Sequence, residues 1–163
     1  MTGQAFLALA TTCAPLIHPD TASALVAVES SFNPHAIGVV GGMLDRQPRS
    51  HREAMATIRS LQANGWNYSV GLAQINARNF ARLGLGAASA LDPCRNLAAT
   101  QVVLLECLHR HRDQVPQVAL RRALSCYYSG NAVTGFRHGY VQRVVAASQR
   151  QPIAASTPPT EKE

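Results

Sequence analysis

The apolar residues of this chain gather into segments that are typical of helices. A short apolar segment covers 5–13, and a second at 21–29 follows Asp20 and Thr21 as candidate N-caps. Asn33-Pro34 ends this second helix, because the residue before a proline is disfavoured in the helical conformation. The pattern predicts a largely helical chain.

Start and stop signals for helices recur along the rest of the sequence. Ser50 and Glu53 form a candidate capping box for a helix that stops at Gly65. Asp92-Pro93 combines an N-cap with proline at the first helical position, and it opens the longest predicted helix. Further helices are predicted at 71–84, 116–128 and 140–148.

Two stretches do not follow the helical pattern. Residues 37–49 are rich in glycine and β-branched side chains, which indicates an irregular loop or a small hairpin around Gly41-Gly42. Residues 148–163 are polar and proline-rich, so we expect a disordered tail there. The predicted fold class is mainly α, an α+β arrangement with a single helical domain at 1–147 and a small β-hairpin or loop element.

Length and charge limit the classes of protein that fit. The chain has 163 residues and no run of 18 apolar positions, so we expect no integral membrane segment. Its 15 basic and 9 acidic residues give a net charge of +6. The arginines are scattered rather than concentrated in one arm or helix, which supports nucleic-acid binding only weakly. We therefore expect anionic surroundings but no nucleic-acid partner.

The chain has four cysteines, namely Cys13, Cys94, Cys107 and Cys126. Their spacing fits neither a CxxC redox motif nor a zinc module. Two alternatives stay open: buried thiols, or two disulfides with three connectivities. On a helix through Cys107, His109 and His111, only Cys107 and His111 share a face, so we expect no metal site and no cofactor.

Of the nine acidic residues, Glu29 and Glu106 stand out as candidates for chemistry. Glu106 precedes Arg110 by four positions, which predicts a surface ion pair on one helix. Glu29 lies at the C-terminal end of an apolar helix with no basic residue nearby in sequence. Desolvation and the negative helix end both predict a raised pKa for its carboxyl. A carboxylic acid that stays protonated near neutral pH is suited to general acid catalysis of glycosidic cleavage.

Three motifs in this order carry a resemblance to a known family: ALVAVESSFNPHAIG, SVGLAQIN and ALSCYYSGN. Together they resemble the lytic transglycosylases related to goose-type lysozyme. With NPHAIGVVGG, GWNYSVGLAQIN and LDPCRNL, the chain is similar more narrowly to the peptidoglycan-cleaving component of type IV secretion systems. The similarity covers about residues 13–145 and implies a lysozyme-like fold.

The resemblance implies roles for individual residues. Glu29 matches the catalytic acid, and Ser30 follows it in the motif. Tyr127 matches a tyrosine that is expected to hydrogen-bond and orient the acid, while Tyr128 stands where the family usually has asparagine. The implied saccharide-binding residues are Ser30, Ser69, Gly71, Gln74, Tyr127 and Tyr128.

The resemblance also implies a reaction and a place for it. Glu29 would act first as acid and then as base, cleaving the bond between N-acetylmuramic acid and N-acetylglucosamine with 1,6-anhydro ring formation. The expected partners are peptidoglycan glycan strands and type IV secretion components, and the expected state is a monomer in the periplasm. The N-terminal residues lack the basic segment of a signal peptide, so the export route stays open. Alternatives are a hydrolytic lysozyme on the same fold and a non-catalytic wall-binding scaffold.

Overall fold

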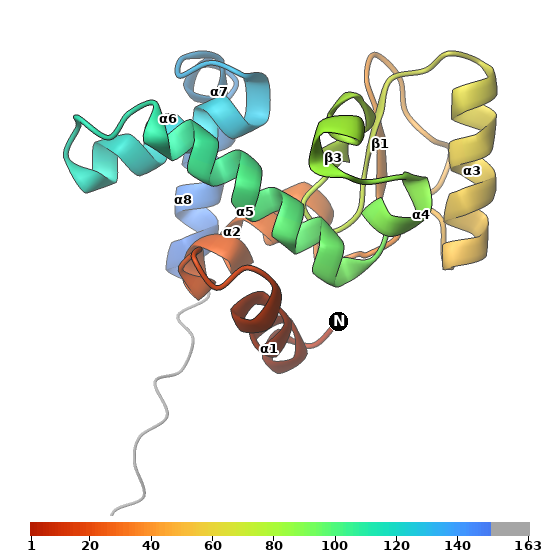
Figure 1. Ribbon diagram of the computed structural model, residues 1–163, viewed down its shortest axis with the longest axis horizontal. Coiled ribbons are helices and arrows are strands. Elements are labelled where there is room, and N and C mark those ends of the chain that lie inside the picture. The colour runs from red at the N-terminus through yellow and green to blue at the C-terminus, as the bar shows by residue number, and fades with distance from the viewer. Residues whose placement is uncertain (151–163) are drawn as a thin grey trace, which may run out of the picture.

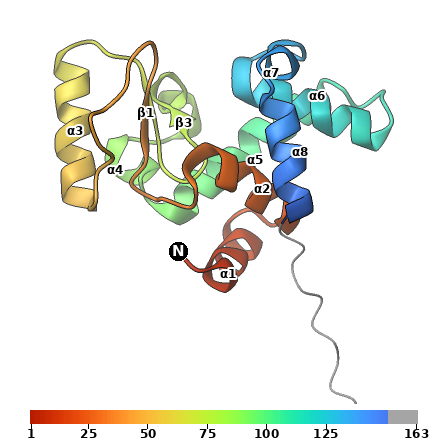
Figure 2. The same cartoon turned by 180° about the vertical axis from the view of Figure 1, so that it is seen from behind.

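A computed structural model describes residues 1–150, a set of helices with a small antiparallel sheet in one half of the molecule (Figures 1 and 2). The helices are α1 (Gly3–Cys13), α2 (Pro19–Ser30), α3 (His51–Ala63), α4 (Ala87–Ala90), α5 (Pro93–His109), α6 (Pro116–Ser129), α7 (Thr134–Arg137) and α8 (Tyr140–Arg150). The strands are β1 (Ile37–Val39), β2 (Tyr68–Val70) and β3 (Ile75–Asn76), followed by the 3-10 turns η1 (Ala77–Asn79) and η2 (Ala81–Leu83). The predicted mainly α class with a small β element is confirmed.

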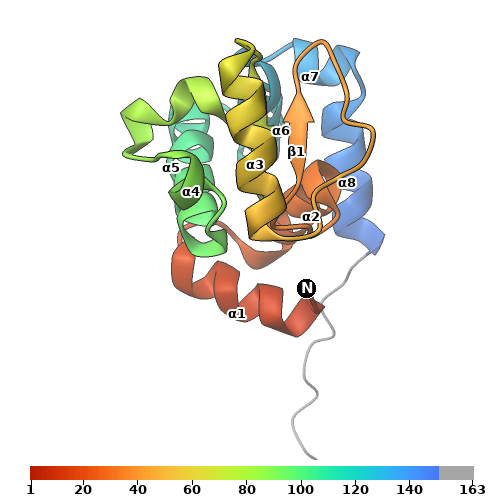
Figure 3. The ribbon, with the colours of Figure 1, turned by 90° about the vertical axis from the view of Figure 1, so that its right-hand side faces the viewer.

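The molecule has two lobes that share α5. The sheet, α3 and α4 lie on one side of this helix, and α6, α7 and α8 lie on the other (Figure 1). Helix α3 packs against the sheet through Ala54 and Ile58, both fully buried, and it forms the outer face of that lobe in Figure 3. The helical lobe has its own core, to which Leu25 and Val26 of α2 contribute.

Helix boundaries follow the sequence signals closely where a cap or a proline is present. The Asp92 side chain accepts a hydrogen bond from Arg95 N at 2.8 Å, and Pro93 opens α5 as predicted. Ser50 caps α3, although the Glu53 carboxylate turns to Arg49 N rather than to the cap itself. Helix α2 starts earlier than predicted, because Pro19 suits the first helical position and His18, not Asp20 or Thr21, is the N-cap.

The sheet differs most from expectation. Strand β1 does not fold back on itself around Gly41-Gly42; it pairs with β2, with Ile37 opposite Val70. The helix predicted at 71–84 is wrong, since this stretch forms a turn, β3 and two 3-10 turns. Gly71 and Gln74 have φ values of 82° and 53°, in the left-handed region that a right-handed helix cannot use.

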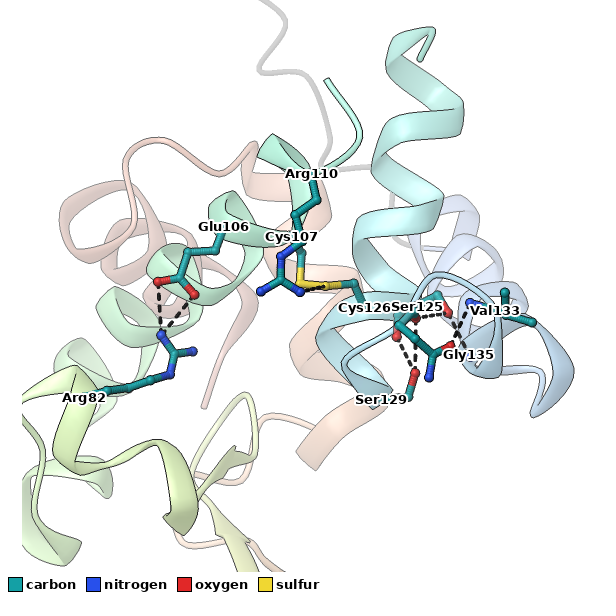
Figure 4. Close-up of a disulfide and its surroundings, with 10 residues drawn as sticks. Arg82, Glu106, Cys107, Arg110, Ser125, Cys126, Ser129, Val133 and Gly135 are labelled. Atoms are coloured by element: carbon teal, nitrogen blue, oxygen red, sulfur yellow. Dashed lines mark hydrogen bonds and ion pairs between the residues drawn. A yellow bond between two sulfur atoms is a disulfide. The ribbon is translucent and has the colours of Figure 1, made fainter. Parts of the chain in front are cut away.

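Two disulfides connect segments that are distant in sequence. Cys13 of α1 is bonded to Cys94 at the start of α5, and Cys107 of α5 is bonded to Cys126 of α6 (Figure 4). Among residues 1–150 no cysteine is free, so the buried-thiol alternative is wrong. Both disulfides hold α5, the helix shared by the two lobes.

The predicted ion pair between Glu106 and Arg110 is not present. Glu106 instead contacts Arg82 of η2 at 3.0 Å, and Arg110 donates a hydrogen bond to Cys126 Sγ at 3.6 Å (Figure 4). Glu106 therefore pairs with an arginine that is distant in sequence, and not with the arginine one helical turn away on α5.

Within residues 1–150, no helix is both long and apolar enough to cross a membrane. Helix α8 runs to Arg150, past the domain boundary predicted at residue 147. Residues 151–163 of the predicted tail lie outside the described part of the chain.

We predict that each disulfide contributes about 3–4 kcal/mol to the free energy of unfolding, because it restricts the unfolded chain. The sequence separations are 81 and 19 residues, so losing Cys13–Cys94 should cost more than losing Cys107–Cys126. Chemical denaturation of the Cys13→Ser/Cys94→Ser and Cys107→Ser/Cys126→Ser double variants measures both effects. Equal stability of wild type and either double variant would contradict this prediction.

Candidate active site

A cleft of about 590 Å³ lies between the two lobes. Its residues come from the end of α2, the sheet, η1, α5 and the end of α6: Glu29, Gly38, Val39, Val40, Ser69, Gln74, Ile75, Asn76, Arg78, Asn79, Val103, Tyr127, Tyr128, Ser129 and Gly130. The cleft therefore brings together the three sequence motifs, which are up to about a hundred residues apart along the chain. Among its described lining residues, Glu29 is the only carboxylic acid.

Glu29 occupies the last turn of α2 and is partly buried. Burial raises the pKa of its carboxyl from 4.5 to about 7, in the direction predicted from the sequence. A hydrogen bond from Tyr140 and the positive charge of Arg143 both act in the opposite direction, because they favour the ionised form. The carboxyl can therefore hold a proton near neutral pH and still has partners for its charge once the proton is gone.

Tyr140 is a partner of Glu29 that the sequence analysis does not identify. Its hydroxyl donates a hydrogen bond to Glu29 Oε1 at 2.6 Å, and its ring is almost completely buried at the start of α8. Arg143 lies one turn further along α8, with its guanidinium carbon 6.0 Å from the centre of the Tyr140 ring. Glu29 and Tyr140 are 111 residues apart, and no motif or spacing links them.

Tyr127 makes a different contact from the one expected. Its hydroxyl donates to the backbone carbonyl of Ala73 at 2.7 Å, so the bond to the acid that the resemblance implied for Tyr127 is made by Tyr140. The Tyr127 ring packs against the hydrophobic cores of both lobes. Tyr127 thus joins the helical lobe to the turn between β2 and β3.

Tyr128 lies on the cleft surface, where 42% of it is exposed. Its ring stacks on Tyr140, with centroids 4.5 Å apart and an interplanar angle of 18°. Its hydroxyl is 3.2 Å from His138 Nδ1. Tyr128 therefore covers the tyrosine that contacts the acid.

The other sequence candidates divide into two groups. Ser69 and Gln74 line the cleft, and Ser69 Oγ accepts a hydrogen bond from Asn76 at 3.1 Å. Gln74 Nε2 donates to the carbonyls of Ala36 and Gly71, so the amide also fixes the turn that carries it. Ser30 and Gly71 are not among the cleft-lining residues.

Ser30 and Gly71 have local structural contacts. Ser30 Oγ donates to the carbonyl of Val26 one turn back in α2, at 3.4 Å. A Cβ at Gly71 would lie 2.4 Å from Asn96 Nδ2, so only glycine fits this position. The role of Gly71 is therefore to let the turn approach α5 closely.

Asn96 is a second residue that the sequence did not single out. It is fully buried on α5, accepts a hydrogen bond from Ala73 N at 2.9 Å, and donates to the carbonyls of Val70 and Ala90. A buried asparagine with all three bonds satisfied anchors the β2–β3 turn to α5. The signal available was a polar residue on a buried helix, in LDPCRNL.

Cys107, His109 and His111 do not form a metal-binding group. Cys107 is in a disulfide, so its sulfur is not available as a thiolate ligand. Residues 1–150 contain no cluster of three or more histidine, cysteine or acidic side chains that could hold a metal ion.

A comparison with protein families agrees with this geometry. The family described as transglycosylase SLT domain matches residues 6–147, and this range includes every residue that lines the cleft. The chain belongs to this family. The family predicted from the three motifs is thereby confirmed.

Curated proteins similar to this chain carry the name virB1, and those from Brucella are named as type IV secretion system proteins. The chain is 49% identical over 159 residues to the type IV secretion system protein virB1 of Brucella suis, covering 91% of this chain and 67% of that protein. It is 50% identical over 151 residues to the protein of the same name from Brucella abortus, covering 88% and 63%. Protein virB1 of Rhizobium radiobacter is 38% identical over 151 residues, covering 90% and 62%. No solved structure gave a significant match.

The chain thus spans about two thirds of the length of these relatives. The similarity to a type IV secretion component, expected from the motifs, is confirmed by their names.

We predict that Tyr140→Phe raises the pKa of Glu29 above about 7, because the lost hydrogen bond favoured the ionised carboxylate. Tyr127→Phe is the matched control: it removes one hydroxyl from the same cleft, but that hydroxyl bonds to Ala73 and not to Glu29. Carbon-13 NMR titration of the glutamate carboxyls, assigned with Glu29→Gln, measures both variants. A Glu29 pKa that is unchanged in Tyr140→Phe, or equally raised in both variants, would refute this assignment.

We also predict that Glu29 makes stability depend on pH. The folded carboxyl keeps its proton up to about pH 7 and the unfolded one only up to about 4.5, so stability falls as the pH rises between these values. Glu29→Gln should therefore be more stable than wild type by about 2–3 kcal/mol at pH 8 and similar to it at pH 4. Denaturant unfolding at both pH values tests this, with Asp45→Asn in the exposed loop as the charge-matched control. A gain in Glu29→Gln that is the same at both pH values would count against a raised pKa.

Proposed function

We propose that this protein is a peptidoglycan lytic transglycosylase in which Glu29 alone serves as acid and then as base. The observation that supports this most directly is the cleft itself, whose described lining contains a single carboxyl, with a pKa raised to about 7. Glycosidases that hydrolyse their substrate commonly use two carboxyl groups on either side of the scissile bond. One carboxyl suffices when the substrate supplies its own nucleophile.

In the first step, the Glu29 carboxyl donates its proton to the glycosidic oxygen between N-acetylmuramic acid and N-acetylglucosamine. The bond from the anomeric carbon to that oxygen breaks, and positive charge develops on the sugar ring. Glu29 is now a carboxylate, stabilised by the Tyr140 hydroxyl at 2.6 Å and by the charge of Arg143.

In the second step, the Glu29 carboxylate removes the proton of the muramyl 6-hydroxyl. The oxygen of that hydroxyl bonds to the anomeric carbon and closes a 1,6-anhydro ring, while Glu29 regains its proton. An internal hydroxyl is held next to the reacting carbon, so it reacts with the advantage of proximity over solvent water.

The cleft walls supply groups for saccharide binding. We assign contact with the glycan to Ser69, Gln74, Tyr127 and Tyr128, which line the cleft. Ser30 and Gly71 serve the same site indirectly, by supporting the end of α2 and the β2–β3 turn.

We place the activity in the periplasm, where a monomer would open the wall locally for assembly of a type IV secretion apparatus. The names of the Brucella relatives, type IV secretion system protein virB1, support this role. The excess of 15 basic over 9 acidic residues suits an anionic wall polymer.

Mass spectrometry of the fragments released from purified peptidoglycan tests this function. We expect anhydromuramyl ends from wild type and from the control Asp45→Asn, and a loss of nearly all release in Glu29→Gln. Reducing muramyl ends from the wild type would identify a hydrolytic lysozyme instead. Binding without release by any of the folded proteins would identify a wall-binding scaffold.

A further inference from the structure

Arg78 is a cation in the cleft that no step of the proposed reaction uses. It lies on η1, immediately after the sheet, and its side chain is exposed at the cleft wall. Within residues 1–150, its guanidinium has no hydrogen-bond or ion-pair partner, and its backbone N–H alone is engaged. An arginine without a protein partner has all its donors available for a ligand.

Arg82 and Arg143 differ from Arg78 because their side chains have protein partners. Arg82 is held by Glu106 at 3.0 Å and by Asn79 Oδ1 at 3.0 Å. Arg143 donates to the carbonyl of His138 at 3.1 Å and lies over the Tyr140 ring. Arg143 is also the cation whose charge acts on Glu29, so Arg78 is not the counter-ion of the acid.

The backbone that carries Arg78 is fixed to the sheet. Asn76 Oδ1 accepts a hydrogen bond from Arg78 N at 3.0 Å, and Asn76 Nδ2 donates to Ser69 Oγ at 3.1 Å. Asn79 is held in turn by Arg82. The position of Arg78 along the cleft is therefore set by the same residues that form the saccharide-binding wall.

When Glu29 is protonated, no ionised acid of the described cleft lining neutralises the positive charge of Arg78. The described lining contains one acid, Glu29, and one arginine, Arg78. When Glu29 is protonated and ready to act, the cleft has a net positive charge at Arg78. An anionic group on the bound strand would neutralise it.

We propose that Arg78 binds a carboxylate of the glycan strand and thereby selects strands that carry this group. The inference rests on the proposed function, since it names a further recognition element of the same cleft. Arginine presents a planar fork that matches both oxygens of a carboxylate. Two sources of this chemistry exist on peptidoglycan: a carboxylate of the stem peptide, or the lactyl carboxylate of a muramic acid that has lost its peptide.

Binding measurements in the Glu29→Gln background separate recognition from cleavage. Three glycan strands of equal length serve as probes: strands with stem peptides, strands stripped of peptide with a free lactyl carboxylate, and stripped strands whose lactyl group is a neutral amide. Arg78→Gln removes the charge, and Arg78→Lys keeps the charge but loses the fork. Arg59→Gln, on the exposed face of α3, is the charge-matched control.

We expect Arg78→Gln to weaken binding of carboxylate-bearing strands by about tenfold or more, with no change for the neutral strand. Arg78→Lys should recover part of the affinity, and Arg59→Gln should leave it unaltered. A loss confined to strands with stem peptides identifies the peptide as the source, and a loss confined to stripped strands identifies the lactyl group.

Equal affinities of Arg78→Gln and its parent for all three strands would overturn the inference and leave the proposed function standing. An equal loss of affinity for charged and neutral strands would also overturn the inference. Arg78 would then act through the packing of the cleft wall and not through a carboxylate of the strand. No binding of any strand by the parent would count against the proposed function itself.

Discussion

A carboxyl group covered by protein lacks the hydration that would stabilise its ionised form, and this cost is the constraint around which the site is arranged. Glu29 bears it at the end of α2, where burial raises the pKa of its carboxyl to about 7. The Tyr140 hydroxyl and the Arg143 charge offset the cost only in part. This intermediate environment, with neither full exposure nor full compensation of the charge, suits the role proposed for Glu29, in which one carboxyl first gives and then takes a proton.

The cleft beside Glu29 depends on how the two lobes are connected. Asn96 ties the β2–β3 turn to α5 through three buried hydrogen bonds, and Gly71 allows the close approach. Tyr127 reaches from α6 to Ala73 of the same turn and packs against both cores. Both lobes thus converge on one short turn, beside which the acid lies.

The sequence predicts those parts of the protein that depend on local chemistry. Asp92 with Pro93, and Gly65 after α3, mark helix ends because caps and left-handed stops act within a few residues. The turn after β2 could not be predicted, because its left-handed Gln74 is held not only by Gly71 in the same turn but also by the carbonyl of Ala36, which is far away in sequence. The hydrogen bond between Tyr140 and Glu29 could not be predicted for the same reason, because the two residues are on different helices. Glu29 was found because apolar neighbours and the scarcity of acids are visible in the sequence itself.

The two disulfides imply an order of events during folding. Closing the 19-residue separation between Cys107 and Cys126 costs less chain entropy than closing the 81 residues between Cys13 and Cys94, by about 1 kcal/mol. We therefore expect the α5–α6 hairpin to form its cross-link first, as an early local unit. The second cross-link must wait until the sheet lobe, which lies between Cys13 and Cys94 in the chain, has been placed. Oxidation of this pair would then report that the end of α2 and the sheet, which supply part of the cleft lining, are in place.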